Sequence, residues 1–160
     1  MRPAPEVVKL NAGGIVKYMR KYYRVGQGLT SNLDISKLGL AAYPREITDL
    51  GSHLKRLNLD DNNVMDLTEG VGQLYNLEEL SVEKNQLFSL SFAFNSLTAL
   101  VYLNLRRNAI VALPNVPGLG ALRNLDVKEN QITELPKNVR RWTSLKTLDI
   151  SNNRLIEVTD

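Results

Sequence analysis

The stretch LVYLNLRRNAIVAL at residues 100–113 decides the fold, because it returns at a nearly constant interval along the chain. It fits the frame L-x-x-L-x-[LVI]-x-x-N-x-[VLI]-x-x-[LV], in which one asparagine stands among regularly placed aliphatic residues. The second leucines of five such frames, at positions 57, 80, 103, 125 and 148, are 23, 23, 22 and 23 residues apart. A weaker copy, NLDISKLGLAAYP, precedes them and has Leu38 at the asparagine position. Repetition at this interval is typical of a solenoid of stacked units.

Each copy predicts a short strand that is followed by a turn. Polar and apolar residues alternate from Tyr102 to Arg106, so that Leu103 and Leu105 should face inward. Stacked copies would form one parallel sheet lined with leucine. An asparagine amide both donates and accepts hydrogen bonds, and it can satisfy backbone groups that an inward bend would leave unpaired. The asparagines predicted to form this structural ladder are Asn62, Asn85, Asn108, Asn130 and Asn153.

The segments that return to the next strand also repeat. Apolar residues recur three apart in them, as in Val71, Leu74 and Leu77, which predicts short 3₁₀ or irregular turns on the face opposite the sheet. Trp142 occupies a leucine position of this pattern, and we interpret it as a core residue.

The segment before the repeats is basic. Residues 1–30 hold six Lys or Arg and one acidic residue, a net charge of +5, whereas the remainder holds 14 basic and 16 acidic residues, a net charge of −2. Helical spacing of Ile15, Tyr18, Met19 and Tyr22 predicts an amphipathic helix at about residues 14–25 that caps the first repeat. Its basic face could instead be an accessory site for a calmodulin-like protein, an acidic protein or an anionic surface.

Few residues in the chain have the chemistry of a catalytic or metal site. There is no cysteine, and the one histidine, His53, lies beside Ser52 without any sign of a converging acid and base. We therefore expect no cofactor, no metal and no enzymatic activity. No apolar run approaches a membrane span, and the N-terminus lacks the apolar core of a secretory signal, so that we expect a cytoplasmic chain.

Residues 30–160 resemble a leucine-rich-repeat protein of the typical intracellular class, with 23-residue units and "LP" after the frame. The first repeat, NLDISKLGLAAYPREITDL, is similar to that of short cytosolic members of the family, in which a helix caps the N-terminal end. The resemblance implies an α/β solenoid: a curved horseshoe with six parallel strands on the concave face and short 3₁₀ or irregular turns on the convex face. Residues 1–29 would form the basic segment with its cap helix, and residues 30–160 the repeat domain.

The sixth repeat is incomplete in this sequence, because the chain stops at Asp160, just after the last frame position, Val158. Its inner leucines would have no following coil to cover them. We expect that either the native chain continues or something else covers this end.

The resemblance also implies protein binding through outward-pointing residues of the concave strands. These residues suggest an acidic zone that gives way to a basic one, with Tyr102 between the two. The negative charge of the repeats argues against a nucleic-acid surface. The candidate partner-binding residues are Arg56, Asp60, Glu79, Glu83, Tyr102, Arg106, Arg107 and Lys128.

A second candidate surface is an apolar stripe along one edge, built on the position three residues after each ladder asparagine. Partial burial between adjacent coils is the alternative explanation of these residues. If they are exposed, the stripe marks a partner in an assembly. Its members are Met65, Phe88, Phe92, Val111 and Ile156.

The sequence thus favours a non-catalytic protein–protein interaction module, a scaffold or adaptor subunit of a larger intracellular assembly. One alternative is a regulatory subunit that docks on an enzyme, such as a phosphatase or a small GTPase. Another is binding of a calmodulin-like or acidic partner through the basic helix. A cytoskeletal or ciliary setting is possible by analogy with the family alone.

Overall fold

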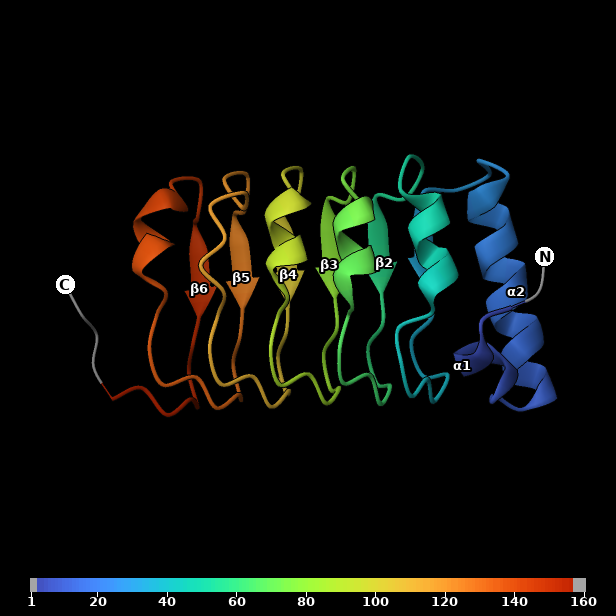
Figure 1. Ribbon diagram of the computed structural model, residues 1–160, viewed down its shortest axis with the longest axis horizontal. Coiled ribbons are helices and arrows are strands. Elements are labelled where there is room, and N and C mark those ends of the chain that lie inside the picture. Colours follow the sequence, from blue (N-terminus) through green and yellow to red (C-terminus); the bar gives the residue numbers. More distant parts are fainter. Residues whose placement is uncertain (1–2, 157–160) are drawn as a thin grey trace.

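The repeats form one parallel sheet of six strands, in the order in which the strands occur along the chain (Figure 1). The structure is a computed structural model that describes residues 3–156. Equivalent leucines of the frame lie side by side, so that Leu103 of one strand is paired with Leu80 and Leu125 of its neighbours. The strands are β1 (Asn32–Asp34), β2 (Arg56–Asn58), β3 (Glu79–Ser81), β4 (Tyr102–Asn104), β5 (Asn124–Asp126) and β6 (Thr147–Asp149).

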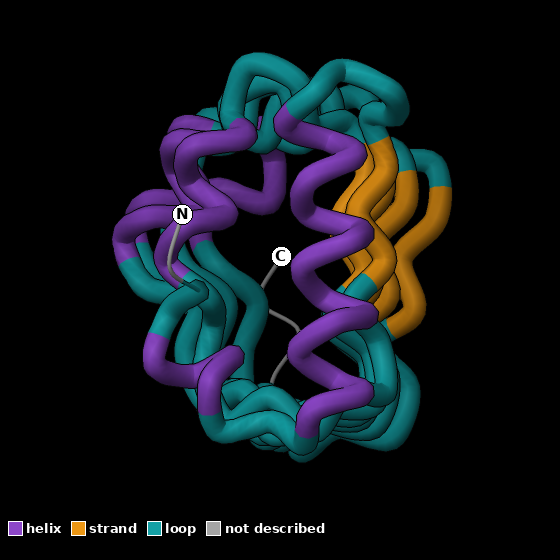
Figure 2. Tube along the Cα trace, turned by 90° about the vertical axis from the view of Figure 1, so that its right-hand side faces the viewer, coloured by secondary structure: helices purple, strands orange, loops and turns teal. Residues whose placement is uncertain are grey.

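The return segments lie on the opposite side of the solenoid from the sheet, and the leucine core fills the space between the two (Figure 2). Four of these segments contain a 3₁₀ turn, and the segment between β4 and β5 is irregular. Trp142 is a core residue, as predicted, with only 5% of its surface exposed. The 3₁₀ turns are η1 (Arg45–Leu50), η2 (Glu69–Gln73), η3 (Phe92–Ser96) and η4 (Lys137–Arg141).

The five asparagine side chains form a ladder along the solenoid, and each of their amides joins two coils. The Asn108 amide nitrogen donates to its own coil at the Leu105 carbonyl (3.0 Å) and to the preceding coil at the Val82 carbonyl (2.8 Å). Its Oδ1 accepts a bond of 3.0 Å from the Leu87 amide, which also belongs to the preceding coil. Each asparagine therefore satisfies backbone groups of the coil before it.

This direction explains why the first repeat has Leu38 at the ladder position. No repeat precedes the first one, so an asparagine there would have no earlier coil to bond. The Leu38 and Leu40 amides, which need an acceptor, both donate to Oδ1 of Asn62, at 3.1 and 3.0 Å.

Two helices cover the N-terminal end of the core. The predicted helix is present as α2 (Ala12–Gly26), and the Asn11 side chain caps its start by accepting a 2.8 Å bond from the Gly14 amide. A short preceding helix, α1 (Pro5–Val8), was not predicted. The inward face of α2 differs in part from the prediction, because Val25 is buried with Tyr18 and Tyr22, whereas Ile15 is only partly buried.

One residue of the first return segment holds both helices. Oε1 of Glu46 accepts bonds from the Tyr18 hydroxyl and the Ala4 amide, each 3.0 Å long. The Glu46 carbonyl accepts a third bond, of 3.1 Å, from the Tyr22 hydroxyl. The cap is therefore fixed to the repeats by polar bonds as well as by its apolar face. The division of the chain at residues 29 and 30 stays a prediction.

The C-terminal coil buries its leucines less completely than the central coils do. Leu148, Ile150 and Leu155 are only partly buried, whereas Leu103 is 1% exposed. Val158 lies outside the described residues, and the expected continuation or cover beyond Asp160 stays a prediction.

The ladder makes a testable prediction for stability. Replacing Asn108 by Ala leaves the Leu87 amide without its acceptor and removes one of two side-chain bonds to each of the Val82 and Leu105 carbonyls. The change should lower the free energy of unfolding by about 1–3 kcal/mol. Urea denaturation of the whole chain measures this. Asn63→Ala is the control, because Asn63 is exposed and its loss should cost less than about 0.5 kcal/mol. Equal stability of the two variants would contradict the structural role of the ladder.

The tyrosines of the cap predict a loss of stability in alkali. Burial, with the charges of Asp49 and Glu46, raises the pKa of Tyr22 to about 12, and burial beside Glu46 also raises the pKa of Tyr18. The folded chain therefore holds these protons more tightly than the unfolded chain, whose phenols titrate near pH 10. The stability that depends on the neutral phenols should be complete below pH 10 and lost as the pH rises towards 12.

Denaturation at several pH values between about 8 and 12 measures this loss. Tyr22→Phe should flatten the pH dependence, because the variant has no Tyr22 phenol to ionise. Tyr23→Phe, on the exposed side of the same helix, should leave the dependence as it is in the wild type.

Candidate functional site

Tyr102 stands near the middle of the concave face, between two hollows. The first hollow, of about 260 Å³, lies over β1–β3, and the second, of about 240 Å³, lies over β5 and β6. Core leucines form part of the lining of each. Tyr102 itself is 39% exposed, and it borders both hollows. The concave face therefore offers two shallow depressions that share one aromatic wall.

The rims of the hollows carry different side chains. Arg56 and Glu79 border the first hollow and form an ion pair of 3.0 Å. Asp126 and Asp149 border the second, on strands in which they are direct neighbours. Burial raises the pKa of the Tyr102 phenol, and the charges of Asp126, Asp60 and Glu83 raise it further. Tyr102 therefore presents a neutral hydroxyl to both hollows near neutral pH.

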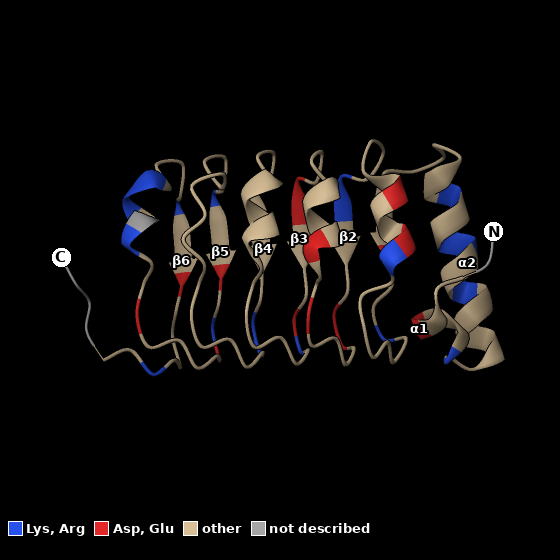
Figure 3. Cartoon of the chain, viewed as in Figure 1, with Lys and Arg blue, Asp and Glu red and all other residues tan. Residues whose placement is uncertain are grey.

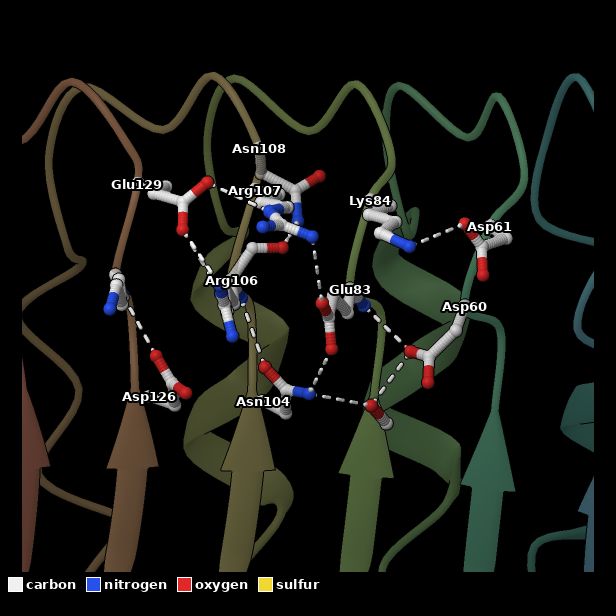
Figure 4. A network of polar contacts seen from close by, with 12 residues as sticks. Asp60, Asp61, Glu83, Lys84, Asn104, Arg106, Arg107, Asn108, Asp126 and Glu129 are labelled. Carbon is white, nitrogen blue, oxygen red and sulfur yellow. Dashed lines mark hydrogen bonds and ion pairs between the residues drawn. The ribbon is translucent and has the colours of Figure 1, made fainter. Parts of the chain in front are cut away.

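Acidic and basic residues lie next to one another at the ends of the concave strands, close to the turns, so that predicted residues of both zones have partners of the opposite charge (Figures 3 and 4). Glu129 accepts bonds from Arg106 (2.8 Å) and Arg107 (2.7 Å), and Arg107 also lies 3.9 Å from Glu83. Lys84 pairs with Asp61 at 3.4 Å. Both arginines of the predicted basic zone thus pair with Glu129, a residue outside the eight predicted from the sequence.

The pairs alternate because each partner comes from the next coil. Arg107 and Glu129 are 22 positions apart in the chain, so their pairing becomes visible only when the coils are stacked in register. The two arginines lower the pKa of the Glu129 carboxyl, first through the hydrogen bonds that they donate to it. Glu129 therefore stays ionised, and the guanidinium groups stay in place above β4.

An unusual backbone conformation places these charges at the rim. The residue before each ladder position has φ between +53° and +58°, although none of these residues is glycine. This left-handed conformation normally costs a residue with a side chain about 1 kcal/mol or more. This conformation turns the chain inward at each coil. The column includes both residues of the Asp61–Lys84 pair and both residues of the Arg107–Glu129 pair. Its members are Lys37, Asp61, Lys84, Arg107, Glu129 and Asn152.

Below the rim, a network of shorter polar side chains joins β2, β3 and β4 (Figure 4). Asp60 accepts bonds of 2.7 Å from the Ser81 hydroxyl and the Glu83 amide. Asn104 donates to the same hydroxyl at 3.1 Å and to the Glu83 carboxylate at 3.3 Å. Asn104 points outward, as predicted, but its neighbours cover it, so that it is only 8% exposed. The network therefore links the middle three strands of the concave face through their side chains.

The eight predicted partner-binding residues all belong to the concave strands or to the turns that directly follow them. Seven of them take part in the arrangement described above. Lys128 is the exception, because it belongs to no ion pair within residues 3–156, although its amide donates a 2.9 Å bond to Asp126. The binding role of all eight stays a prediction.

The edge stripe is exposed, so partial burial between coils does not explain it. Its five members are between 49% and 82% exposed. Backbone hydrogen bonds run along the column, from the Val111 amide to the Phe88 carbonyl (3.3 Å) and from the Ile156 amide to the Thr133 carbonyl (3.1 Å). The stripe is therefore an ordered second surface, and its use by a partner stays a prediction.

Residues 3–156 contain no group of three or more His, Cys, Asp or Glu side chains that could hold a metal ion. The His53 ring lies 2.8 Å from the Ser52 hydroxyl, but both residues are exposed in a loop without a third partner. Within the same residues, no helix has the length and apolar character needed to cross a membrane.

Comparison with known proteins identifies the repeats. Residues 44–153 match the family model described as the leucine-rich-repeat domain of the endo-beta-N-acetylglucosaminidase EndoS. The structure of a leucine-rich-repeat protein of Leptospira interrogans is similar, with a TM-score of 0.72 and 28% identity, over 86% of this chain and 41% of that one.

Two relatives carry a similar stretch within far longer chains. A probable inactive serine/threonine-protein kinase, roco10 of Dictyostelium discoideum, is 28% identical over 95% of this chain and 6% of its own length. An adenylate cyclase of Podospora anserina is 34% identical over 91% of this chain and 8% of its own length. The chain therefore spans less than a tenth of either relative.

The polar network predicts an unusual result at Asp60. Burial raises the pKa of this carboxyl, and the charges of Glu83 and Asp61 also raise it, against the lowering effect of the bonds from Ser81 and the Glu83 amide. Asn at this position can accept the same two bonds without a charge. Asp60→Asn should therefore stabilise the chain at pH 7.

The gain has a defined pH dependence. Because the pKa of Asp60 is raised in the folded state, ionisation costs stability as the pH rises through that pKa. The advantage of Asp60→Asn should shrink as the pH falls, since the wild-type carboxyl is then neutral as well. Denaturation midpoints of both chains at several pH values between about 3 and 7 test this. A less stable variant at pH 7 would contradict it.

Proposed function

The chain belongs to the leucine-rich-repeat family, and we propose that it is a non-catalytic interaction module that binds a partner protein across its concave face. The observation that carries this proposal is the position of Tyr102, half exposed between two hollows on a rigid sheet. Leucine-rich-repeat domains in general are interaction folds. Aromatic residues that adjoin pockets near the centre of a surface are typical anchors of protein interfaces.

The Tyr102 side chain contributes little to the stability of the fold. Its neighbour Leu103 is 1% exposed and belongs to the core, whereas Tyr102 points away from the core on the same strand. A partner could place one side chain in each hollow and cover the tyrosine ring between them. The tyrosine has two side-chain torsions and is held by a rigid strand, so that little conformational entropy is lost on binding.

The charges around Tyr102 support specificity more than affinity. The arginines already have acidic partners within the chain, such as Glu129 for Arg106, so that a partner must match or exchange existing ion pairs. Such exchange contributes little net energy at an exposed site, but it penalises a partner of the wrong charge pattern. A protein surface, with side chains of both signs, suits this face better than a small anion or cation does.

Within a cell, this module would act as a scaffold or adaptor of a larger cytoplasmic assembly. A regulatory role on an enzyme is the second candidate. The similarity to short stretches of an adenylate cyclase and of an inactive kinase favours this role, because repeats of this kind share a chain with an enzyme-related domain there. A calmodulin-like clamp on α2 is less compatible with the fold, because Tyr18 and Tyr22 of that helix are buried against the repeats.

Substitution of Tyr102 tests the concave site. Tyr102→Ala should weaken partner binding by about 1–3 kcal/mol, because it removes a central aromatic anchor. The free energy of unfolding should change by less than about 1 kcal/mol, because the side chain packs little against the core. The matched control is Tyr75→Ala, which removes a tyrosine of similar exposure outside the concave strands.

Proteins captured from cells by the wild type and by both variants can be compared quantitatively, and the affinity of the main partner then measured with purified proteins. Loss of the partner with Tyr102→Ala but not with Tyr75→Ala is the expected result. If Phe88→Ser abolishes binding while Tyr102→Ala has no effect, the partner occupies the edge stripe and the concave assignment is wrong.

A further inference from the structure

Helix α2 carries a second exposed surface that the concave site does not use. Successive helical residues are 100° apart, so that Val16, Lys17, Arg20, Tyr23 and Arg24 share one side of the helix, opposite the buried Tyr18, Tyr22 and Val25. All five side chains are exposed, including Val16 at 57% and Tyr23 at 63%. We call these five residues the outer face of α2.

The positive charge of the outer face is not compensated. Within residues 3–156, Lys17, Arg20 and Arg24 have no carboxylate within ion-pair distance, and the sequence holds no acidic residue from Val7 to Leu33. Lys21 differs, because it turns towards the sheet and pairs with Asp34 at 3.1 Å. The arginines of the concave face differ as well, since Arg56, Arg106 and Arg107 all have acidic neighbours.

The outer face is held rigidly at one end of the solenoid. The opposite side of α2 is anchored by the buried tyrosines and by their bonds to Glu46. Figure 2, viewed from this end, shows α2 in front of the coils with its outward side uncovered by any described segment. A flat surface could therefore approach this end without meeting the concave site, which lies along the side of the solenoid.

We propose that the outer face of α2 binds the anionic leaflet of a lipid membrane. Three cations without acidic neighbours complement the negative surface of such a leaflet, which attracts each nearby Lys or Arg regardless of exact geometry. Val16 and Tyr23 lie among these cations, seven positions and therefore two helical turns apart, where they can enter the headgroup region together. Tyrosine is enriched at that depth, because its ring is apolar and its hydroxyl is polar.

The same features fit an acidic protein less well. A helix surface with long basic side chains is convex. Arg24 borders a hollow of about 230 Å³ beside Lys21 and Asp34, and the other four residues of the outer face line neither hollow of the concave face. A specific protein interface needs packed pockets and matched polar partners. A bilayer needs only cations and side chains that insert to a shallow depth. The interaction is peripheral, and it orients the solenoid with α2 towards the lipid.

Binding of the full chain to vesicles tests the proposal. The wild type should bind vesicles of phosphatidylcholine with phosphatidylserine, should not bind vesicles of phosphatidylcholine alone, and should dissociate as the salt concentration rises. Replacing Lys17, Arg20 and Arg24 together by Gln should reduce the partition coefficient about 100-fold, since each cation near an anionic leaflet contributes about fivefold. Thermal melts confirm that the variants are folded.

A matched variant separates this surface from net charge. Lys137, Arg141 and Lys146 are exposed at the other end of the solenoid, and replacing all three by Gln changes the net charge by the same amount. This control should bind vesicles within about twofold of the wild type, because its cations lie away from the lipid. If both triple variants lose binding equally, the attraction is a property of the whole chain and the proposed site is wrong.

The apolar residues distinguish a membrane from a soluble polyanion. Replacing Val16 and Tyr23 together by Ser should weaken vesicle binding severalfold while the salt dependence remains. In the Tyr23→Trp variant, the fluorescence of the new indole should show that it becomes shielded from water on vesicle binding. The fluorescence of the wild type, which comes from the buried Trp142, is the baseline. If the Ser variant binds unchanged and soluble polyglutamate competes fully with the vesicles, the outer face takes acidic polymers and the lipid assignment is overturned.

Discussion

The structure depends on the hydrogen bonds that the ladder asparagines make to backbone groups at the inward bend of each coil. Without these bonds, carbonyls such as those of Val82 and Leu105 would be left without partners beside an apolar core. An unpaired buried polar group costs about 1–3 kcal/mol, and the bend recurs in every coil. The leucine core can form only because these bends are satisfied, since the bends bring successive strands into register.

The same bend produces the features of the concave face. It forces the residue before each ladder position into the left-handed conformation and thereby places a row of mostly charged side chains at the rim. Because successive coils are stacked in register, these side chains find partners one coil away, as Arg107 does in Glu129. The strands below hold Tyr102 between two hollows, so that one local constraint determines both the charged rim and the aromatic centre.

The sequence was sufficient to predict what repeats along the chain. The strands, the inward leucines, the ladder and the core position of Trp142 all follow from spacing, because each unit obeys the same local rule. The left-handed residues and the role of Glu129 could not be predicted in this way, since they depend on distances between coils. The face of α2 that is buried was predicted only in part, because Glu46, 28 positions after Tyr18, helps to set the rotation of the helix.

The direction of the ladder has a consequence for how such a chain can change during evolution. Each unit brings the amide that its predecessor needs, as Asn62 does for Leu38 and Leu40. If an internal unit is duplicated, the new copy therefore carries the asparagine that the preceding unit needs and the backbone groups that the asparagine of the following unit bonds. The first unit has no preceding repeat to bond and needs no asparagine at this position, where it has Leu38. Lineages of this fold can lengthen or shorten by whole units while the residues that select a partner vary independently.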